Sequence, residues 1–138
     1  MRKVKLELIN AFSATPLFGM YLPTDDEIAR YGTMRDDYAR RCKEEPFINR
    51  CALALCIGAR TFGISIPELQ AARDQLKPRL TEDRQKLMAF SRIVSVGMAK
   101  RPNSWKGIAK AFNRKHPTVI NATQKYGAQI AAALEMSR

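Results

Sequence analysis

Residues 104–126 (SWKGIAKAFNRKHPTVINATQKY) carry the pattern of two helices joined by a tight turn. Ser104 is a typical helix N-cap, and Ile108 begins an apolar stripe at helical spacing. Residues 113–115 break the apolar periodicity, so the turn is expected there. Pro117 fits the first turn of a second helix, because its fixed φ suits that position. The second helix then continues through Val119, Ala122, Tyr126 and Ile130 to about Met136.

A helix-turn-helix of this kind places the start of its second helix in the major groove of DNA. Here that start reads Arg-Lys-His-Pro-Thr (residues 114–118), which is cationic and rich in hydrogen-bond donors. The pattern therefore predicts contact with DNA bases.

The charge distribution favours the same partner. The chain has a net charge of +11, and residues 1–47 hold 8 Lys/Arg against 8 Asp/Glu, so the whole excess lies in residues 48–138. Residues 84–134 contain ten Lys/Arg and no acidic residue. A solvated helical face normally mixes both signs, so a polyanion is the better explanation. The C-terminal helix is mostly alanine and no apolar run approaches about 18 residues, which favours nucleic acid over a membrane.

The rest of the chain predicts further helices and an all-α class. Thr24 to Glu27 form a capping box for a short helix ended by Gly32, and Thr33 caps a second helix through about Glu44. Further helices are expected over 47–62, from Ser65 to about residue 75, and, after a basic connection, from the N-cap Thr81 over 82–100. Residues 1–23 have no clear pattern. The stretch from Leu8 to Leu22 invites a signal-peptide interpretation, which is disfavoured by the interrupting residues Glu7, Asn10, Pro16 and Pro23. Two units are therefore predicted, a charge-balanced N-terminal appendage over 1–46 and a helix-turn-helix domain over 47–138.

No catalytic or metal centre is evident in the sequence. Cys42, Cys51 and Cys56 have no metal-ligand spacing and are expected to be reduced, buried thiols of a cytoplasmic protein. The neighbouring carboxylates Glu82 and Asp83 do not pair with any nucleophile or base at motif spacing. We expect no enzyme activity and no cofactor.

From about Ile48 to Leu134 the chain resembles the C-terminal DNA-binding domain of the bacterial replication initiator DnaA. The anchors are an Arg-Gln pair on the long helix (84–85), Ser-Trp-Lys-Gly-Ile-Ala (104–109), Phe-Asn-Arg-Lys-His-Pro-Thr-Val (112–119), then Ala122 and Lys125. In that family the last stretch reads Phe-Gly-Gly-Arg-Asp-His-Thr-Thr-Val and begins the recognition helix. The resemblance implies a multi-helix, Trp-repressor-like helix-turn-helix domain that binds double-stranded DNA.

The resemblance also implies roles for individual residues. The family residues that lie along the DNA backbone correspond to Arg84, Gln85, Ser104 and Thr118 of this chain. Arg114 and His116 correspond to the Arg and the His of the family's recognition-helix stretch, and His116 is expected to lie against a thymine methyl. Lys77 and Arg79 precede the long helix, where the family inserts a basic loop into the minor groove. The full set of expected DNA contacts is Lys77, Arg79, Arg84, Gln85, Ser104, Lys106, Arg114, Lys115, His116, Pro117, Thr118, Asn121 and Lys125.

Three departures from the family change the expected recognition. Asn113 stands for Gly-Gly, Lys115 for the base-reading Asp, and Pro117 for the first Thr. Lysine donates to guanine O6 or N7, whereas aspartate accepts from cytosine N4, so a different DNA sequence should be preferred. The sequence contains no Gly-x-x-x-x-Gly-Lys-Ser/Thr phosphate loop, so DNA binding without ATPase activity is expected.

The sequence thus predicts a nucleoid-associated regulator of transcription or replication that selects a DNA sequence. Two alternatives remain open. One is a non-specific nucleic-acid binder that uses the same basic face, and the other is an adaptor whose residues 1–46 bind a partner protein. The oligomeric state is left open by the sequence.

Overall fold

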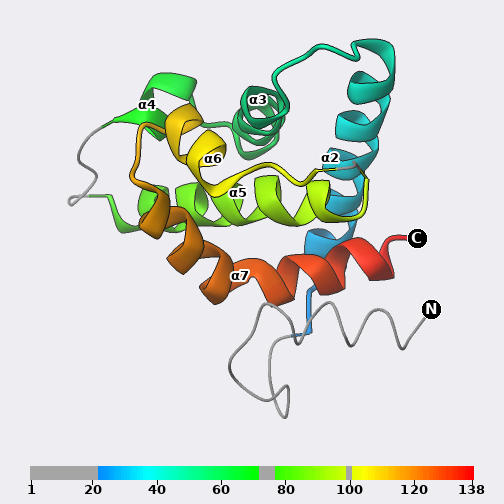
Figure 1. Ribbon diagram of the computed structural model, residues 1–138. Coiled ribbons are helices and arrows are strands. Elements are labelled where there is room, and N and C mark those ends of the chain that lie inside the picture. The colour runs from blue at the N-terminus through cyan, green and yellow to red at the C-terminus, as the bar shows by residue number, and fades with distance from the viewer. Residues whose placement is uncertain (1–21, 72–76, 99–100) are drawn as a thin grey trace.

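The computed structural model describes residues 22–71, 77–98 and 101–138. Among these residues there is no strand, which confirms the all-α class. In Figure 1, the long helix α5 runs through the centre, with α3 and α6 on one side and α7 on the other. The helices are α2 (Asp25–Glu44), α3 (Arg50–Phe62), α4 (Ile66–Gln70), α5 (Pro78–Val96), α6 (Trp105–Ala111) and α7 (His116–Met136).

The core forms where α5 packs between its neighbours. Leu87, Phe90 and Val94 are buried on α5, as the helical spacing predicts. Met98, the next residue at this helical spacing, lies beyond the end of α5 and is 38% exposed. Helix α7 contributes small side chains to the same core, since Ala131 and Ala133 are both buried. Small residues at such a contact allow two helices to approach closely.

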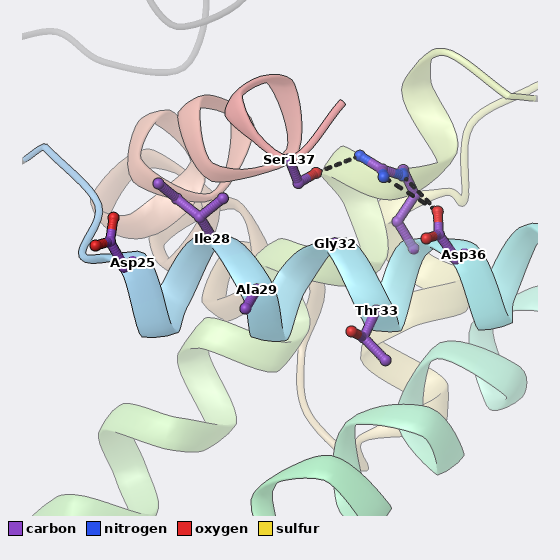
Figure 2. Close-up of a pocket in the computed structure, with 8 residues that line it drawn as sticks. Asp25, Ile28, Ala29, Gly32, Thr33, Asp36 and Ser137 are labelled. Carbon is purple, nitrogen blue, oxygen red and sulfur yellow. Dashed lines mark hydrogen bonds and ion pairs between the residues drawn. The ribbon is translucent and has the colours of Figure 1, made fainter.

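Helix α2 begins and ends as predicted, but it is one helix where two were expected. The amide of Glu27 donates to Thr24 Oγ1 at 3.2 Å and the amide of Thr24 donates to Glu27 Oε1 at 2.9 Å, which confirms the capping box. The predicted break at Gly32 and new cap at Thr33 are wrong, because one helix of 20 residues spans both. A Cβ at Gly32 would lie 2.7 Å from Ser137 Cβ. The glycine therefore reflects the close approach of the α7 C-terminus, visible in Figure 2.

Helix α2 belongs to the same core as the later helices. Tyr31, Met34 and Tyr38 are at most 2% exposed, and the Tyr31 ring stacks on Phe90 with centroids 6.0 Å apart. The Arg35 guanidinium donates to Leu134 O at 2.7 Å and Ser137 Oγ at 2.6 Å, capping the end of α7. The predicted unit boundary at residue 46 stays a prediction, but the described helix before it is packed into the core. Residues 1–21 lie outside the described part.

Helices α3 and α4 are shorter than the sequence patterns predicted. Asn49 caps α3 by accepting from the amide of Ala52 at 3.1 Å, so the helix starts at Arg50 rather than at residue 47. Gly63, with φ +67°, ends it as expected. Helix α4 starts after the predicted cap Ser65 and stops at Gln70, while residues 72–76 of its predicted extension lie outside the described residues.

Helix α5 starts earlier than predicted. Pro78 occupies its first turn, a position that tolerates proline because the missing N–H has no helical partner. Thr81 was expected as the N-cap, but it lies inside the helix and its hydroxyl donates to Lys77 O at 3.4 Å. The helix ends at Val96 rather than near residue 100. The predicted end, residues 99–100, lies outside the described part of the chain.

Candidate nucleic-acid interface

The two helices and the turn of the predicted motif are confirmed. Ser104 Oγ accepts from the amide of Gly107 at 2.9 Å and so caps α6. Asn113 has a left-handed φ of +55°, which ends α6 and reverses the chain. After this reversal, the amide of Arg114 donates a hydrogen bond of 2.8 Å to Ala109 O. Helix α7 begins at His116 with Pro117 in its first turn, as expected.

The turn is held in place by α4. Gln70 Nε2 donates to Ala111 O at 2.9 Å, and Asn113 Nδ2 donates to Gln70 O at 3.1 Å. These reciprocal bonds join the last residue of α4 to the end of α6 and to the left-handed residue. Sequence reasoning missed Gln70, because the contact spans 43 residues and leaves no local pattern.

The Trp105 ring packs against the core of the protein. The ring is half-buried against the core, and the guanidinium carbon of Arg92 lies 4.2 Å from its centroid. Arg92 Nη1 also donates to Asn103 O at 2.8 Å, and the amide of Asn103 donates to Ser95 Oγ at 2.8 Å. This polar network fixes the entry of the chain into α6. No local sequence pattern predicts the roles of Arg92 and Asn103, because their contacts depend on how α5 packs beside α6.

Arg84 does not lie on the surface that its expected DNA contact requires. The residue is 2% exposed, and its Nε and Nη2 donate to Leu69 O and Glu68 O, both at 2.6 Å. Burial and, to a smaller extent, the nearby Arg114 charge together lower the pKa of the Arg84 guanidinium to about 10. Arg84 thus caps the carbonyl end of α4. Its neighbour in the expected pair, Gln85, is half-buried.

The other expected contacts are mostly accessible. Arg114 and Thr118 are half-buried, and burial lowers the pKa of Arg114. In Figure 1, α4, α6, the start of α5 and the start of α7 lie at the same end of the molecule. The structure therefore brings most of the predicted residues to one end. The exposed members are Lys77, Arg79, Ser104, Lys106, Lys115, His116, Pro117, Asn121 and Lys125.

The electrostatics of this end favour an anion. The N-cap residue Lys115 makes no side-chain capping bond, and the first turn of α7 contains no acidic residue. The helix N-terminus adds partial positive charge to that of Lys115. Lys106 and Lys110 lie one turn apart on α6 and are both exposed. Most acidic side chains of the described residues lie on α2, whose first turn alone holds three. Glu68 on α4 and Glu82 and Asp83 on α5 are the exceptions at this end, and Glu68 Oε2 lies 3.9 Å from Lys77 Nζ.

The three cysteines are not among the expected DNA contacts, although Cys51 Sγ lies beside Gly107 of α6. Cys42 and Cys51 are half-buried free thiols, while Cys56 is exposed, so its predicted burial is wrong. Burial raises the pKa of the Cys51 thiol. The described residues contain no cluster of three potential metal ligands. None of the described helices is both long and apolar enough to cross a membrane.

The fold defines a multi-helix all-α protein with a capped helix-turn-helix pair at one end. Comparison with known protein families, curated proteins and solved structures found no match to this chain.

Proposed function

We propose that the protein binds double-stranded DNA sequence-selectively through α6 and α7, and regulates transcription or replication without ATPase activity. The main observation that supports this proposal is that Lys115 and His116 are exposed at the start of α7, where no side chain caps the helix. A helix start of this kind is the part that reaches base edges in a helix-turn-helix complex. A cytoplasmic, nucleoid-associated location follows from the proposal.

The interface residues divide into base readers and phosphate contacts. Lys115 is suited to guanine O6 or N7, and His116 to a thymine methyl. Lys106 and Lys125 supply salt-dependent phosphate contacts. Lys77 at the N-cap of α5 and Arg79 in its first turn are the minor-groove contacts that the resemblance implies. The resemblance to the DnaA DNA-binding domain supports this division. Lys115 in place of the family's aspartate implies a different preferred sequence.

Selection from a pool of random duplexes at about 150 mM salt tests the proposal. The intact protein is expected to enrich one motif, and Lys115→Ala and His116→Ala are expected to lose preference at one position each. Lys43→Ala is the matched control, because Lys43 is an exposed cation in the last turn of α2, which in Figure 1 lies at the opposite side of the molecule from the start of α7. A pool without enrichment, bound with a steep salt dependence, would replace sequence selection by non-specific binding.

The adaptor alternative requires a narrower deletion than residues 1–46. Removing all of them would remove Tyr31, Met34 and Tyr38 from the core and unfold the domain. Deleting residues 1–21 leaves α2 intact. Loss of a partner protein with unchanged DNA affinity would then favour the adaptor, whereas unchanged regulation favours the direct role.

A further inference from the structure

The first three turns of α7 have an uncharged exposed face. Asn121 and Gln124 are exposed and follow Pro117 at spacings of four and three, which places the three side chains on one side of the helix. The opposite side is buried through Val119, Ala122 and Thr123. Cations border this face, with Lys125 along the helix and Lys115 at its start.

The side-chain amides on this face differ from the other side-chain amides of the protein, which make hydrogen bonds between helices. Gln70 bonds Ala111 and Asn113, and Gln129 donates to Glu27 across the α2–α7 contact. The side-chain amides of Asn121 and Gln124 have no hydrogen-bond partner among the described residues, so their donors and acceptors are available to a ligand. Asparagine is also a weak helix former, so helix stability does not explain Asn121.

We propose that Asn121 and Gln124 read adenine in the major groove, each through a bidentate pair to N6 and N7. The amide oxygen accepts from the adenine amino group and the amide nitrogen donates to N7, a pairing that neither lysine nor histidine can make. The inference rests on the proposed DNA binding and deepens it, because it assigns the central part of α7 to sequence readout. Residues three apart rise about 4.5 Å along the helix, which is comparable to one base-pair step. Two nearby adenines are therefore expected, beside the position read by the α7 N-terminus.

The experiment compares motifs selected by the intact protein, Asn121→Ala and Gln124→Ala. Each substitution is expected to relax one adenine position by about tenfold or more, the discrimination of one bidentate pair. Lys106→Ala is the matched control: it should weaken all sites alike, lower the salt slope by about one unit, and leave the motif unchanged. Circular dichroism checks that each variant keeps its helices.

A second measurement needs no variant. Replacing each adenine of the selected site by 7-deazaadenine removes the N7 acceptor and keeps base pairing, so affinity should fall at the two assigned positions. If Asn121→Ala and Gln124→Ala keep the full adenine preference, or 7-deazaadenine has no effect, the inference is overturned while DNA binding stands. If the intact protein enriches no motif at all, the proposed function itself has failed.

Discussion

Asn113 Nδ2 donates a hydrogen bond of 3.1 Å to the backbone oxygen of Gln70, which joins the turn between α6 and α7 to the last residue of α4. The same asparagine holds the left-handed φ of +55° that reverses the chain. One residue thus performs two structural tasks, conformational and hydrogen-bonding. Because the direction of α7 depends on this turn, both tasks affect the proposed interface.

Two substitutions of Asn113 separate the tasks. Asn113→Gly keeps a residue that tolerates positive φ and loses only the side-chain bond, at a cost of about 1 kcal/mol. Asn113→Ala loses the bond and adds left-handed strain of about 1 kcal/mol or more, so it should be the less stable variant. Urea denaturation measures both free energies of unfolding. Equal stabilities would mean that the conformation of Asn113 carries no cost.

A substitution of Arg84 tests whether its side chain stabilises the fold or contacts DNA. Arg84→Met removes the charged donor from the carbonyls of Glu68 and Leu69, of which Glu68 O also accepts from the amide of Ala71 at 3.3 Å. We therefore expect a loss of about 3 kcal/mol in unfolding free energy. At a temperature where the variant stays folded, the salt slope of DNA binding should be unchanged, because the buried side chain reaches no phosphate. Lys106→Ala serves as the comparison and should lower the slope by about one. A lower slope in Arg84→Met would restore Arg84 to the interface.

The features predicted correctly from sequence are those that neighbouring residues determine. The caps at Thr24, Ser65 and Ser104 each use a bond to a residue three positions away, and this pattern is readable without a structure. The turn around Asn113 and the start of α7 at Pro117 follow from the same local rules. For this reason, the helix-turn-helix was the most predictable part of the chain.

The predictions that were wrong concern residues whose roles depend on contacts between distant parts of the chain. Gly32 looks like a helix end, and only its approach to Ser137 shows why glycine is needed within a helix. In the sequence, Arg84 has the pattern of a surface cation. Only its contact with α4, whose Leu69 and Glu68 carbonyls accept from the guanidinium, explains its burial. The buried positions of Tyr31 and Tyr38 were likewise hidden by the charged residues around them on α2.

Gly58 tests the contact between α3 and α5. A Cβ at this position would lie 2.5 Å from Leu87 Cδ2, and Leu87 is fully buried, so its side chain has little room to move. Gly58→Ala should destabilise the protein through overpacking, by about 1–3 kcal/mol less the gain in helix propensity. Gly32→Ala meets Ser137 near the chain end and should cost less. Thermal denaturation in the two variants gives the order, and the reverse order would contradict the packing described for α3 and α5.

Tyr31 predicts an alkaline loss of stability. Burial raises the pKa of its phenol well above the ordinary value near 10, although the Arg30 charge opposes the shift. Below about pH 10 both folded and unfolded chains keep the proton, so the contribution of Tyr31 to stability is fully present. Above it the unfolded chain releases the proton while the folded chain retains it, so stability falls by up to about 1.4 kcal/mol per pH unit.

Phenylalanine at this position isolates that contribution. Tyr31→Phe removes the ionisable group and keeps the ring that stacks on Phe90, so its unfolding free energy should fall less between about pH 9 and pH 11. The expected difference from the intact protein is about 1.4 kcal/mol at pH 11, measured by urea denaturation at each pH. The comparison near pH 8, where the Tyr31 phenol keeps its proton in both the folded and the unfolded chain, removes any direct packing effect of the hydroxyl. Parallel pH curves for the two proteins would show that Tyr31 ionises in the folded state as readily as in the unfolded chain.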